Sequence, residues 1–450
     1  MIVAKFGGTS VANADAIRRL IEIVRSRIHE RPVVVVSALD HVTDELLALA
    51  QHCGTGDGQA IEYSVDALVE RHEQVGRALP GCSSALEHIR ADAEQMRAEV
   101  HGARGRRLSP AEVDGIAGRG EVWSSRLVAA ALAEAGIDSA WIDIRPIMVT
   151  DGRFGRATPY TQVLNKRARD QLKPLADSGR VPVTQGFIGA TATGVSTTLG
   201  RGGSDFTAAL LGAALGAERV EIWTDVNGLM TADPHIVPSA KTLAAASYDE
   251  AAELATFGAR ILHPATAYPL VRAGIPIVIL NSREPSRLGT TIGPQAQLDR
   301  MGDSPIRSIS WKQGITVVNI RAPRMLGTYG FLRALFEVFE RHETVVDVLA
   351  SGEVSISLTI EDRTRLGLIA KDLGQLGEVW IEEGRAIVAI VGIGLKHTPG
   401  LAGRVFNAVW PANVEMISQG ASAINMTFVV REDEGPDVVR RLHQEFFGSC

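Results

Sequence analysis

Two segments of the chain place a basic side chain beside paired glycines, a combination suited to binding anions. The first is KFGGTS, residues 5–10, which directly follows a short apolar run. Because glycine has no Cβ, backbone N–H groups can approach a phosphate closely there, and Lys5 adds a positive charge. The segment lacks the Gly-Lys-Ser/Thr ending of a Walker loop. It predicts a phosphate-binding turn, with a turn of no further function as the alternative.

The second segment is TTLGRGGSDFTAALL, residues 197–211, in which Arg201 stands between two glycines. A guanidinium on such a bare loop can hold a carboxylate through two parallel hydrogen bonds. Ser204 and Asp205 follow where a helix is expected to begin, and helix capping is the simpler explanation for them. Glu121, in GRGEVWSSRL, also lies at an expected helix start, where it either stabilises the helix or accepts an ammonium group. Glu121 and Arg201 would then hold the two ends of an amino acid.

The third segment is EIWTDVNGLMTADP, residues 221–234. An expected strand ends in it at Thr224 and Asp225, and an Asn-Gly pair follows. A β-turn explains this pair most simply. The functional alternative is that the strand end and the turn hold the base and ribose of a nucleotide. Together with the two anion-binding segments, it would let the chain bind an amino acid and a nucleoside triphosphate. Transfer of the γ-phosphoryl group needs mainly positioning and neutralisation of charge.

A sheet must position these segments, because short apolar strands alternate with amphipathic helices up to about residue 290. Such alternation predicts an α/β fold with a mainly parallel sheet sandwiched by helices, and with ligands at the carboxyl ends of its strands. Helices are expected, for example, at 14–28 and 205–217. Strands are expected at 2–6, 32–37, 139–143, 181–186, 219–224 and 276–280.

Two regions depart from this alternation. Residues 59–103 read as two charged helices split by Pro80 and Gly81, and we expect a helical hairpin on the surface. His72, His88 and His101 should then lie in solvent. Between 283 and 308, proline, glycine and polar residues replace the periodic pattern, which predicts a domain boundary. The catalytic domain is therefore expected to cover residues 1–295.

Beyond this boundary the chain contains an internal repeat. Each copy reads as a strand, a loop ending in glycine (Gly330 or Gly400), an amphipathic helix, and two strands joined by a glycine-containing turn. The repeat predicts two βαββ modules, at 305–383 and 384–450, with a strand exchange between them left open. Such modules could bind a small ligand at their shared edge, or could serve only for association.

Composition limits the class of partner. The 450 residues carry a net charge of −6 without a basic block, which argues against nucleic-acid binding. The three cysteines are odd in number and lack metal-type spacing, which favours a reducing compartment over a disulfide framework. We find no secretory pattern, and no apolar run approaches the roughly 20 residues that span a bilayer. The sequence therefore predicts a cytoplasmic protein, away from membranes, without a metal site of its own.

The ordered motifs resemble those of the aspartokinases in the amino-acid kinase family. In the family's order and at familiar distances, the chain carries KFGGTSV, DGRFGRATP, QGFIGA, TTLGRGGSDFTAALL, IWTDVNGLMTADP and ATFGARILHPAT. Its C-terminal repeat resembles paired ACT domains, and its layout is closest to the monofunctional, lysine-sensitive type. The resemblance implies transfer of the γ-phosphate of ATP, with Mg²⁺, to the β-carboxylate of L-aspartate. The product, 4-phospho-L-aspartate, would lead to lysine, threonine and methionine.

Matched position by position, the resemblance implies roles in three groups. Lys5, Asp205 and Arg260 would be catalytic, with Lys5 neutralising charge on the transferred group and Asp205 organising that lysine. Contacts with the aspartate substrate are implied for Arg201 (α-carboxylate), Glu121 (α-ammonium), Thr43 and Ser204. Contacts with the nucleotide are implied for Gly7, Gly8, Ser37, Thr224, Asp225, Met230 and His235.

Three departures from the family's pattern bear on these roles. Arg260 replaces a lysine, which keeps the charge but changes its shape. Met230 and His235 stand where tyrosine and arginine are frequent, which leaves open how the base and ribose are held. Asp44 replaces an asparagine beside Thr43.

Lysine is the effector that the resemblance implies, bound at the first ACT module. The residues matching that site are Met325, Thr328, Asp347, Ser351, Glu353 and Val354. Two carboxylates suit a ligand with two ammonium groups, but Gly352 replaces a serine, so weakened or lost inhibition stays open, as does a structural role for the acids. Because the relatives pair through their ACT modules, a homodimer or a dimer of dimers is implied.

Two other functions remain open. The first is an amino-acid kinase acting on glutamate, acetylglutamate or carbamate, although such relatives usually lack both the ACT pair and the KFGGTSV form. The second is a catalytically weak sensor of amino acids, in which the kinase fold only reports binding at the ACT modules. Met230 and His235 keep this second alternative open.

Overall fold

The computed structural model describes residues 1–257, 264–294, 305–327 and 329–448. Arg260 and Thr328 therefore lie outside the described residues, as does Cys450. The chain forms two compact units. The N-terminal unit consists of Met1–Leu229, Ala244–Tyr248 and Leu262–Asp299, and the C-terminal unit consists of Met230–Leu243, Asp249–Ile261 and Arg300–Cys450.

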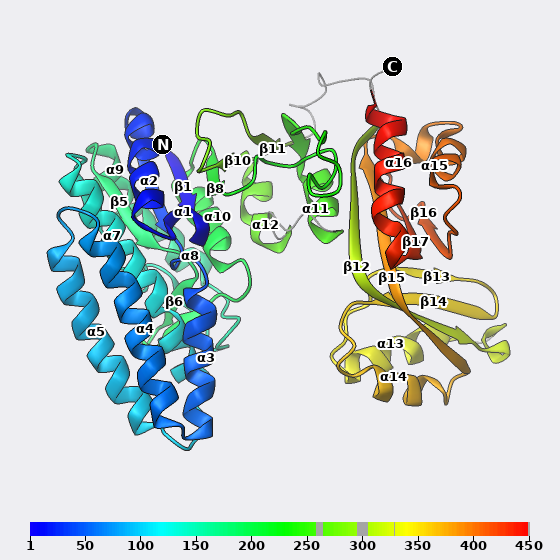
Figure 1. Ribbon diagram of the computed structural model, residues 1–450, viewed down its shortest axis with the longest axis horizontal. Helices are drawn as coiled ribbons and strands as arrows, with labels where there is room; N and C mark the ends of the chain where they lie inside the picture. The colour runs from blue at the N-terminus through cyan, green and yellow to red at the C-terminus, as the bar shows by residue number, and fades with distance from the viewer. Residues whose placement is uncertain (258–263, 295–304, 328, 449–450) are drawn as a thin grey trace. The chain divides into compact units, whose positions relative to one another are not determined.

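An eight-stranded sheet in the order β3-β5-β2-β1-β8-β10-β11-β9 forms the centre of the N-terminal unit (Figure 1). Neighbouring strands are parallel except for the antiparallel pair β10–β11. All six expected strands are present, so the predicted mainly parallel sheet is confirmed. The strands are β1 (Ile2–Phe6), β2 (Pro32–Val36), β3 (Ser139–Trp141), β5 (Val181–Gln185), β8 (Val220–Thr224), β9 (Ala245–Ser247), β10 (Ile277–Asn281) and β11 (Thr290–Gly293).

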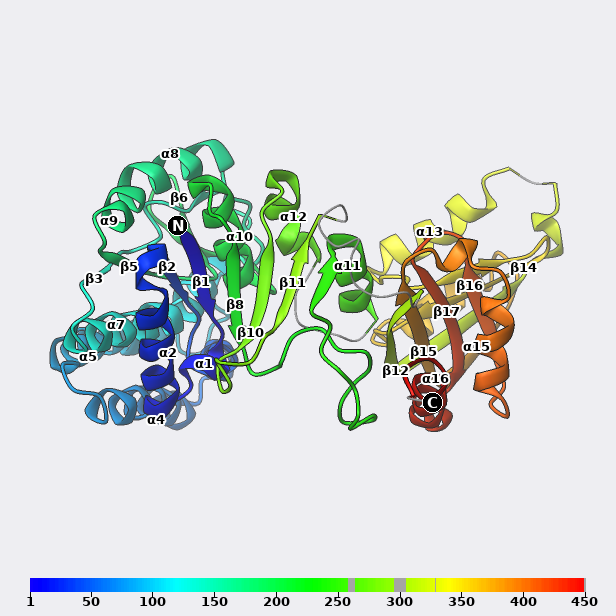
Figure 2. The ribbon, with the colours of Figure 1, turned by 90° about the horizontal axis from the view of Figure 1, so that it is seen from above.

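Helices cover both faces of this sheet (Figure 2). Every residue of β1 and β2 is buried, as expected for apolar runs covered on two sides. On one face lie α2 and α7, and on the other lies α10, packed against α8 and α12. The helices are α1 (Gly8–Val11), α2 (Ala14–Arg27), α3 (Val42–Thr55), α4 (Gly58–Arg77), α5 (Ser83–Gly102), α6 (Pro110–Ala117), α7 (Arg119–Glu134), α8 (Thr161–Gln171), α9 (Lys173–Asp177), α10 (Gly203–Leu215) and α12 (Pro264–Ala273).

The same unit contains a small three-stranded sheet with the strand order β4-β6-β7. Its strands are β4 (Val149–Thr150), β6 (Ile188–Thr191) and β7 (Ser196–Thr198). Because β6 and β7 form an antiparallel hairpin that ends just before α10, this sheet fixes where the Arg201 loop begins.

The expected helical hairpin is present as α4 and α5, but one of its histidines is not in solvent. The His72 side chain is fully buried and meets the Trp123 ring edge-on, with 5.0 Å between ring centroids. Its Nδ1 lies 2.7 Å from the Leu68 carbonyl oxygen, and burial lowers the His72 pKa to about 4. The prediction was wrong for His72 because α4 packs on α3, α5 and α7 at once. His88 is exposed as expected, and His101 is only partly buried.

One six-stranded antiparallel sheet, in the order β13-β14-β12-β15-β17-β16, organises the C-terminal unit. The long strands β12 and β15 pair along most of their length and therefore run through both halves of the sheet. The repeated order of strand, helix, strand and strand is confirmed. The strands are β12 (Ile306–Arg321), β13 (Leu349–Ser351), β14 (Ser355–Ile360), β15 (Glu378–Gly392), β16 (Met416–Gln419) and β17 (Asn425–Arg431).

Two helices cover each half of this sheet. Leu335 and Phe339 of α13 (Phe331–Arg341) pack with α14 (Leu366–Leu373) on the half made by β14. On the half made by β17, α15 (Leu401–Val409) and α16 (Gly435–Phe447) share an apolar cluster that also contains Ala232 and Val237. From Asp249 onward, α11 (Tyr248–Thr256) belongs to the same unit.

None of the helices in the described part of the chain has the length and apolar character needed to cross a membrane. Cys53 and Cys82 are both buried and unbridged, and burial raises the pKa of each thiol.

Candidate active site

The carboxyl ends of four neighbouring strands meet at one edge of the large sheet. The Gly7 N–H donates to the Trp223 carbonyl oxygen at 3.0 Å, and the Ser37 N–H donates to that of Phe6 at 3.1 Å. The Gly186 N–H donates to the Val36 carbonyl oxygen at 2.8 Å. The ends of β5, β2, β1 and β8 are thereby held in register, as expected for a ligand-binding edge.

A pocket of about 680 Å³ opens at this edge. Its walls come from β1, the loop after β2, α6, α7 and the start of α10. Segments far apart in the sequence therefore meet here, and eight of the predicted site residues line the pocket: Lys5, Gly8, Ser37, Thr43, Glu121, Arg201, Ser204 and Asp205.

Lys5 forms an ion pair with Asp205 in this pocket, with 2.6 Å between Nζ and Oδ1. Lys5 lies on β1, and Asp205 lies in the first turn of α10. Both side chains are largely buried. A Cβ on Gly8 would lie 3.2 Å from the Asp40 Cα and 3.3 Å from the Ala38 carbonyl oxygen, so the turn after β1 runs close to the loop after β2. The carboxylate thus holds the ammonium group close to Gly7, where an added Cβ would lie 3.5 Å from Lys5 Nζ.

Glu121 is the most strongly perturbed acid in the pocket. It lies in the first turn of α7 and is 3% exposed. Burial raises the pKa of Glu121 to about 8, although the Ala38 backbone N–H and the charge of Lys5 both oppose this rise. Among the described residues, none makes a hydrogen bond to Oε2 of Glu121. This buried oxygen is therefore ready to accept a cation from a ligand.

Arg201, in contrast to the buried Glu121, is exposed to solvent. It stands on the loop before α10, where Gly202 adopts a φ of 71° as the helix N-cap. No described carboxylate comes within ion-pair distance of the Arg201 guanidinium. A Cβ on Gly186 would lie 2.5 Å from that of Ser204, so the end of β5 abuts the start of α10 and only glycine fits there. Arg201 is thus an unpaired cation next to a helix start held firmly by packing.

Two residues of this pocket were not singled out by the residue-based reasoning. The Asp114 carboxylate accepts hydrogen bonds from the Gly155 N–H and from both the N–H and the hydroxyl of Thr198, at 2.7–3.0 Å. Burial raises the pKa of Asp114, and these bonds oppose the rise. Asp114 thereby joins the loop DGRFGRATP to β7. The sequence did contain a signal for Asp114, namely an acidic residue among the apolar residues of the segment AEVDGIAG.

Phe187 is the other missed residue. Its φ of 66° is unusual for a non-glycine residue, and its backbone N–H is held by the Thr207 hydroxyl at 3.1 Å. The sequence signal for Phe187 was its place in the motif QGFIGA. Strain of this kind at a pocket wall commonly accompanies function.

The predicted nucleotide residues fall in both units. Gly7, Ser37, Thr224 and Asp225 belong to the N-terminal unit, where the Thr224 hydroxyl donates to the Asp225 carboxylate at 3.2 Å. Met230 and His235 belong to the C-terminal unit. His235 is exposed, and its N–H donates to the Asp233 carboxylate at 2.9 Å.

The predicted effector residues lie in the first half of the C-terminal sheet. The Val354 carbonyl oxygen accepts from the Ala322 N–H at 2.8 Å, which brings the turn before β14 to the segment that ends in Met325. Glu353 is exposed in that turn, and Ser351 is exposed at the end of β13. Asp347 lies 3.3 Å from the Lys312 ammonium, which also lies 2.8 Å from Glu361. The Asp347 carboxylate therefore already has a cation of the chain itself as a neighbour.

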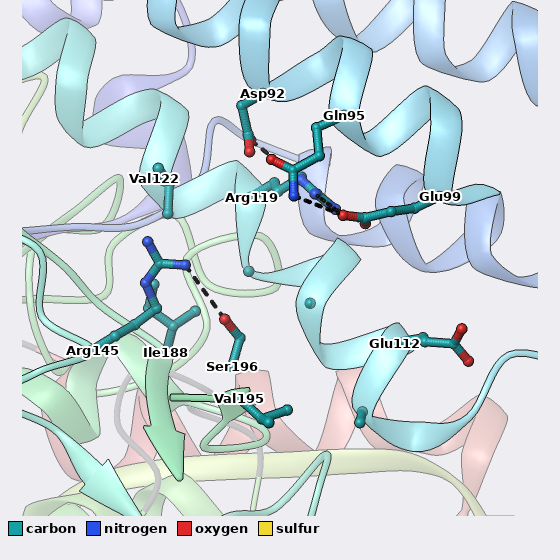
Figure 3. A pocket seen from close by; sticks show the side chains of 13 residues that line it. Asp92, Gln95, Glu99, Glu112, Arg119, Val122, Arg145, Ile188, Val195 and Ser196 are labelled. Carbon is teal, nitrogen blue, oxygen red and sulfur yellow. Dashed lines mark hydrogen bonds and ion pairs between the residues drawn. The ribbon is translucent and has the colours of Figure 1, made fainter. Parts of the chain in front are cut away.

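A second cavity of about 480 Å³ lies between α5, α6, α7 and the β6–β7 hairpin (Figure 3). The Arg119 guanidinium donates to both Glu99 oxygens, at 2.9 and 3.0 Å. Across the cavity, Arg145 is held by Asp143 at 2.7 Å and reaches toward Ser196. The charges here neutralise one another. The pocket at the strand ends, where Glu121 and Arg201 lack such partners, is therefore the candidate active site.

Comparisons with known proteins agree with this geometry. The model of the amino acid kinase family matches residues 1–281, and a model of the ACT domain matches residues 388–446. The chain is 38% identical to lysine-sensitive aspartokinase 3 of Escherichia coli (strain K12) over 460 residues, which cover 99% of each protein. The chain belongs to the aspartokinases. It is also 34% identical to chloroplastic aspartokinase 1 of Arabidopsis thaliana, covering 99% of this chain and 80% of that protein.

Solved aspartokinase structures are similar over the whole chain. The E. coli aspartokinase III complex with aspartate and ADP, described as an R state, has a TM-score of 0.86 and 37% identity, and covers 99% of this chain and 100% of that one. The complex of the same enzyme with lysine and aspartate, described as a T state, has a TM-score of 0.84. Aspartate kinase from Clostridium acetobutylicum has the same TM-score of 0.84 at 26% identity. The predicted family and fold class are therefore confirmed.

Proposed function

We propose that this aspartokinase transfers the γ-phosphoryl group of ATP to the β-carboxylate of L-aspartate, giving 4-phospho-L-aspartate. One observation carries the proposal: a single pocket holds an ion-paired lysine together with a buried carboxylate and an arginine that have no ion-pair partner among the described residues. An acidic amino acid has the complementary groups, namely an ammonium, an α-carboxylate and a second carboxylate to receive the phosphoryl group. The relative of known structure that binds aspartate and ADP supports this reading.

In this proposal the residues act mainly by placing charge. Arg201 holds the α-carboxylate, Glu121 holds the α-ammonium, and the Thr43 and Ser204 hydroxyls complete the hold. Lys5 neutralises charge on the transferred phosphoryl group, and Asp205 keeps its ammonium in place. The substrate β-carboxylate is itself the nucleophile, and with an ordinary pKa near 4 it is ionised at pH 7, so a strong general base is not required.

The nucleotide contacts are assigned to Gly7, Gly8, Ser37, Thr224, Asp225, Met230 and His235. Mg²⁺ enters as the complex with ATP. Among the described residues, no group of three or more His, Cys, Asp or Glu side chains is placed to form a metal site. In this proposal the magnesium ion is bound chiefly through the substrate phosphates, which is its usual mode in kinases. Arg260, outside the described residues, is assigned a supporting positive charge.

The C-terminal unit is assigned regulation by lysine, through Met325, Thr328, Asp347, Ser351, Glu353 and Val354. The relative solved with lysine and aspartate motivates this assignment. We assign residues 1–295 to the kinase domain, and 305–383 and 384–450 to the two ACT modules. We further propose that the protein associates as a homodimer or a dimer of dimers. We also propose a cytoplasmic location, which is in keeping with two unbridged buried cysteines.

A hydroxylamine trapping assay tests the function directly. Purified protein with Mg-ATP should form a hydroxamate with L-aspartate but not with L-glutamate, and lysine should inhibit more strongly than threonine or methionine. Hydroxamate from glutamate would instead indicate a kinase for another amino acid. Absence of any hydroxamate together with tight lysine binding would contradict the enzyme and favour the amino-acid sensor.

A further inference from the structure

Asp114 is a buried acid of the candidate active site to which the chemistry above gives no role. It lies on α6 and is 3% exposed. A capping box fixes the start of this helix: the Ser109 hydroxyl accepts from the Glu112 N–H at 3.3 Å, and the Glu112 carboxylate accepts from the Ser109 N–H at 2.8 Å. Pro110 follows at the first helical position, which it suits. The helix therefore holds Asp114 at a fixed place on the pocket wall.

The Asp114 carboxylate joins two segments that are far from it in the sequence. Its Oδ1 accepts from the Thr198 hydroxyl at 2.9 Å, and its Oδ2 accepts from the Thr198 N–H at 2.7 Å. The Gly155 N–H lies 3.0 Å from Oδ1 and 2.9 Å from Oδ2. Among the described residues, no cation forms an ion pair with this carboxylate. A carboxylate offers two acceptor oxygens to these donors, whereas an amide would offer one.

The bond to Gly155 attaches an exposed loop to the wall of the pocket. This loop, residues 151–158, is mostly exposed between its ends. The Ala157 N–H donates to the Thr198 carbonyl oxygen at 2.9 Å, which ties the loop to β7 a second time. Asp114 therefore stands at the junction of α6, the loop 151–158 and the end of β7.

Arg201 lies in a tight turn that packs against this loop. The Gly203 N–H donates to the Gly200 carbonyl oxygen at 3.0 Å, which closes the turn around Arg201. Gly200 has a φ of 79°, a conformation that favours glycine. A Cβ on Gly200 would lie 3.0 Å from the Gly155 carbonyl oxygen, so the turn and the loop are in close contact. The position of the Arg201 backbone therefore depends on the loop that Asp114 holds.

The other end of the turn is held by α10. The Leu199 N–H donates to the Phe187 carbonyl oxygen at 2.8 Å, and the Phe187 N–H donates to the Thr207 hydroxyl at 3.1 Å. That hydroxyl donates in turn to the Gly203 carbonyl oxygen at 3.0 Å. Asp114 thus fixes the end of the turn that leaves β7, and Thr207 fixes the end that begins α10. Because both ends are held, the backbone of the turn has little freedom left to lose when a ligand binds.

We propose that Asp114 is a positioning residue for the aspartate substrate: it holds the loop 151–158 against β7 and thereby places Arg201 for the α-carboxylate. This rests on the proposed function, in which Arg201 makes that contact. It requires no contact between Asp114 and the ligand. All the residues involved belong to the N-terminal unit. Loss of the Asp114 hydrogen bonds should therefore weaken the hold on aspartate and leave ATP binding and the chemical step almost unchanged.

The test uses the full chain and the variant Asp114→Asn, which keeps the shape of the side chain and leaves one acceptor oxygen in place of two. Thr198→Val is a milder variant, because it removes the hydroxyl bond and keeps the N–H bond. Glu73→Gln is the matched control, since Glu73 is a carboxylate only 8% exposed and is paired with Arg77 and Arg90 in the α4–α5 hairpin. Initial rates give kcat and the KM values for aspartate and ATP, and thermal unfolding gives Tm.

For Asp114→Asn we expect KM for aspartate to rise about tenfold, as for loss of a well-made hydrogen bond to a buried charged group. KM for ATP and kcat should stay within about twofold, because the interaction lost serves aspartate binding alone. Thr198→Val should raise KM for aspartate about threefold, and Glu73→Gln should lower Tm only. Equal changes in both KM values, a loss confined to kcat, or a similar rise in Glu73→Gln would overturn the proposal.

The Arg201→Ala background shows whether Asp114 acts through Arg201. Once the guanidinium is gone, Asp114→Asn and Thr198→Val should add almost nothing to KM for aspartate, although Tm should still fall. A rise as large as in the wild-type background would mean that Asp114 acts by another route, and the proposal would fail. Should Asp114→Asn not fold, Thr198→Val decides alone: its rise must be present in the wild-type background and absent beside Arg201→Ala.

The wild-type protein separates this proposal from the proposed function. If wild-type protein phosphorylates aspartate while Asp114→Asn and Thr198→Val keep its KM for aspartate, the role of Asp114 is wrong and the function stands. If wild-type protein forms no hydroxamate with aspartate, the proposed function fails and the role of Asp114 fails with it.

Discussion

Two carboxylates, the buried Glu121 and the half-buried Asp347, are both assigned the ammonium group of an amino acid, yet their surroundings differ. Burial raises the pKa of both. At Glu121 the Ala38 N–H and the charge of Lys5 oppose the rise, but no described cation forms an ion pair with this carboxylate. Oε2 of Glu121 and Oδ2 of Asp347 each lack a hydrogen-bond partner among the described residues. Asp347 has the Lys312 ammonium 3.3 Å away. The first acid must obtain its cation from the substrate, whereas the second already has one from the chain. Substitutions around Glu121 should therefore have far larger effects than substitutions around Asp347.

The largest effect should follow from Lys5→Ala. This change removes the ammonium next to the transferred phosphoryl group, and loss of one such stabilising group lowers kcat by about 10²–10³-fold. Stopped hydroxamate assays at saturating ATP and aspartate give kcat, and circular dichroism checks the fold. Lys166→Ala, an exposed lysine paired with Asp170 on α8, is the matched control and should retain wild-type kcat. A Lys5→Ala variant with wild-type kcat would show that the ion pair with Asp205 is only structural.

Glu121→Gln should mainly weaken aspartate binding. Losing one partner of a buried charge pair typically costs about 2–5 kcal/mol, so KM for aspartate should rise by at least about 30-fold. KM for ATP should change little, because the assigned nucleotide contacts lie elsewhere. Initial-rate kinetics at varied aspartate measures this. An unchanged KM for aspartate would remove Glu121 from the substrate site and end the contrast with Asp347.

The same variant should also flatten the dependence of stability on pH. With a pKa of about 8 when folded and an ordinary value of 4.5, Glu121 binds its proton more tightly in the folded chain. Its contribution to stability is complete below pH 4.5 and is lost as pH rises through about 8. Between about pH 6 and about pH 9, Tm of the wild-type protein should therefore fall more than Tm of Glu121→Gln. Parallel curves would mean that Glu121 is already ionised in the folded protein.

Arg201→Ala should have a smaller effect than Glu121→Gln, because Arg201 is exposed before the ligand arrives. Hydrogen bonds to charged groups are worth about 1.5–3 kcal/mol, and an exposed group falls near the lower limit, so KM for aspartate should rise about 10–30-fold with kcat largely kept. Arg201→Lys keeps the charge without the planar pair of donors, so its KM for aspartate should lie between those of the wild-type protein and Arg201→Ala. A loss confined to kcat would instead give Arg201 a role in the chemical step.

The pattern of apolar residues predicted the helices and strands well. It could not show which helices pack against neighbours on more than one side. Runs such as Val33–Val36 are long enough to be strands and too short for helices, so β2 was predictable. His72 was placed in solvent because α4 is rich in charges along its length. The burial of His72 depends on Trp123, which is 51 positions later in the sequence and reaches it only through tertiary packing.

The site was predictable in its residue types but only partly in its assembly. Lys5, Glu121 and Arg201 each had a recognisable local setting, and the family resemblance supplied their grouping. Asp114 was missed because its partners Gly155 and Thr198 lie 41 and 84 residues away. The assignment of residues 230–243 to the C-terminal unit was equally hidden, because two short apolar side chains do not form a periodic pattern.

The smallest effect should come from Lys312→Met, which tests the other side of the comparison. Removing this ammonium leaves the half-buried Asp347 carboxylate without its cation, so an incoming lysine would meet a carboxylate with greater need of a partner. Because the pair is only partly buried and Glu361 also competes for Lys312, we expect about a 3–5-fold fall in the lysine concentration that gives half-inhibition. Arg333→Met, which breaks an exposed pair with Glu337 on α13, is the control. Weaker inhibition in Lys312→Met would mean that Lys312 organises the effector site instead of competing for it.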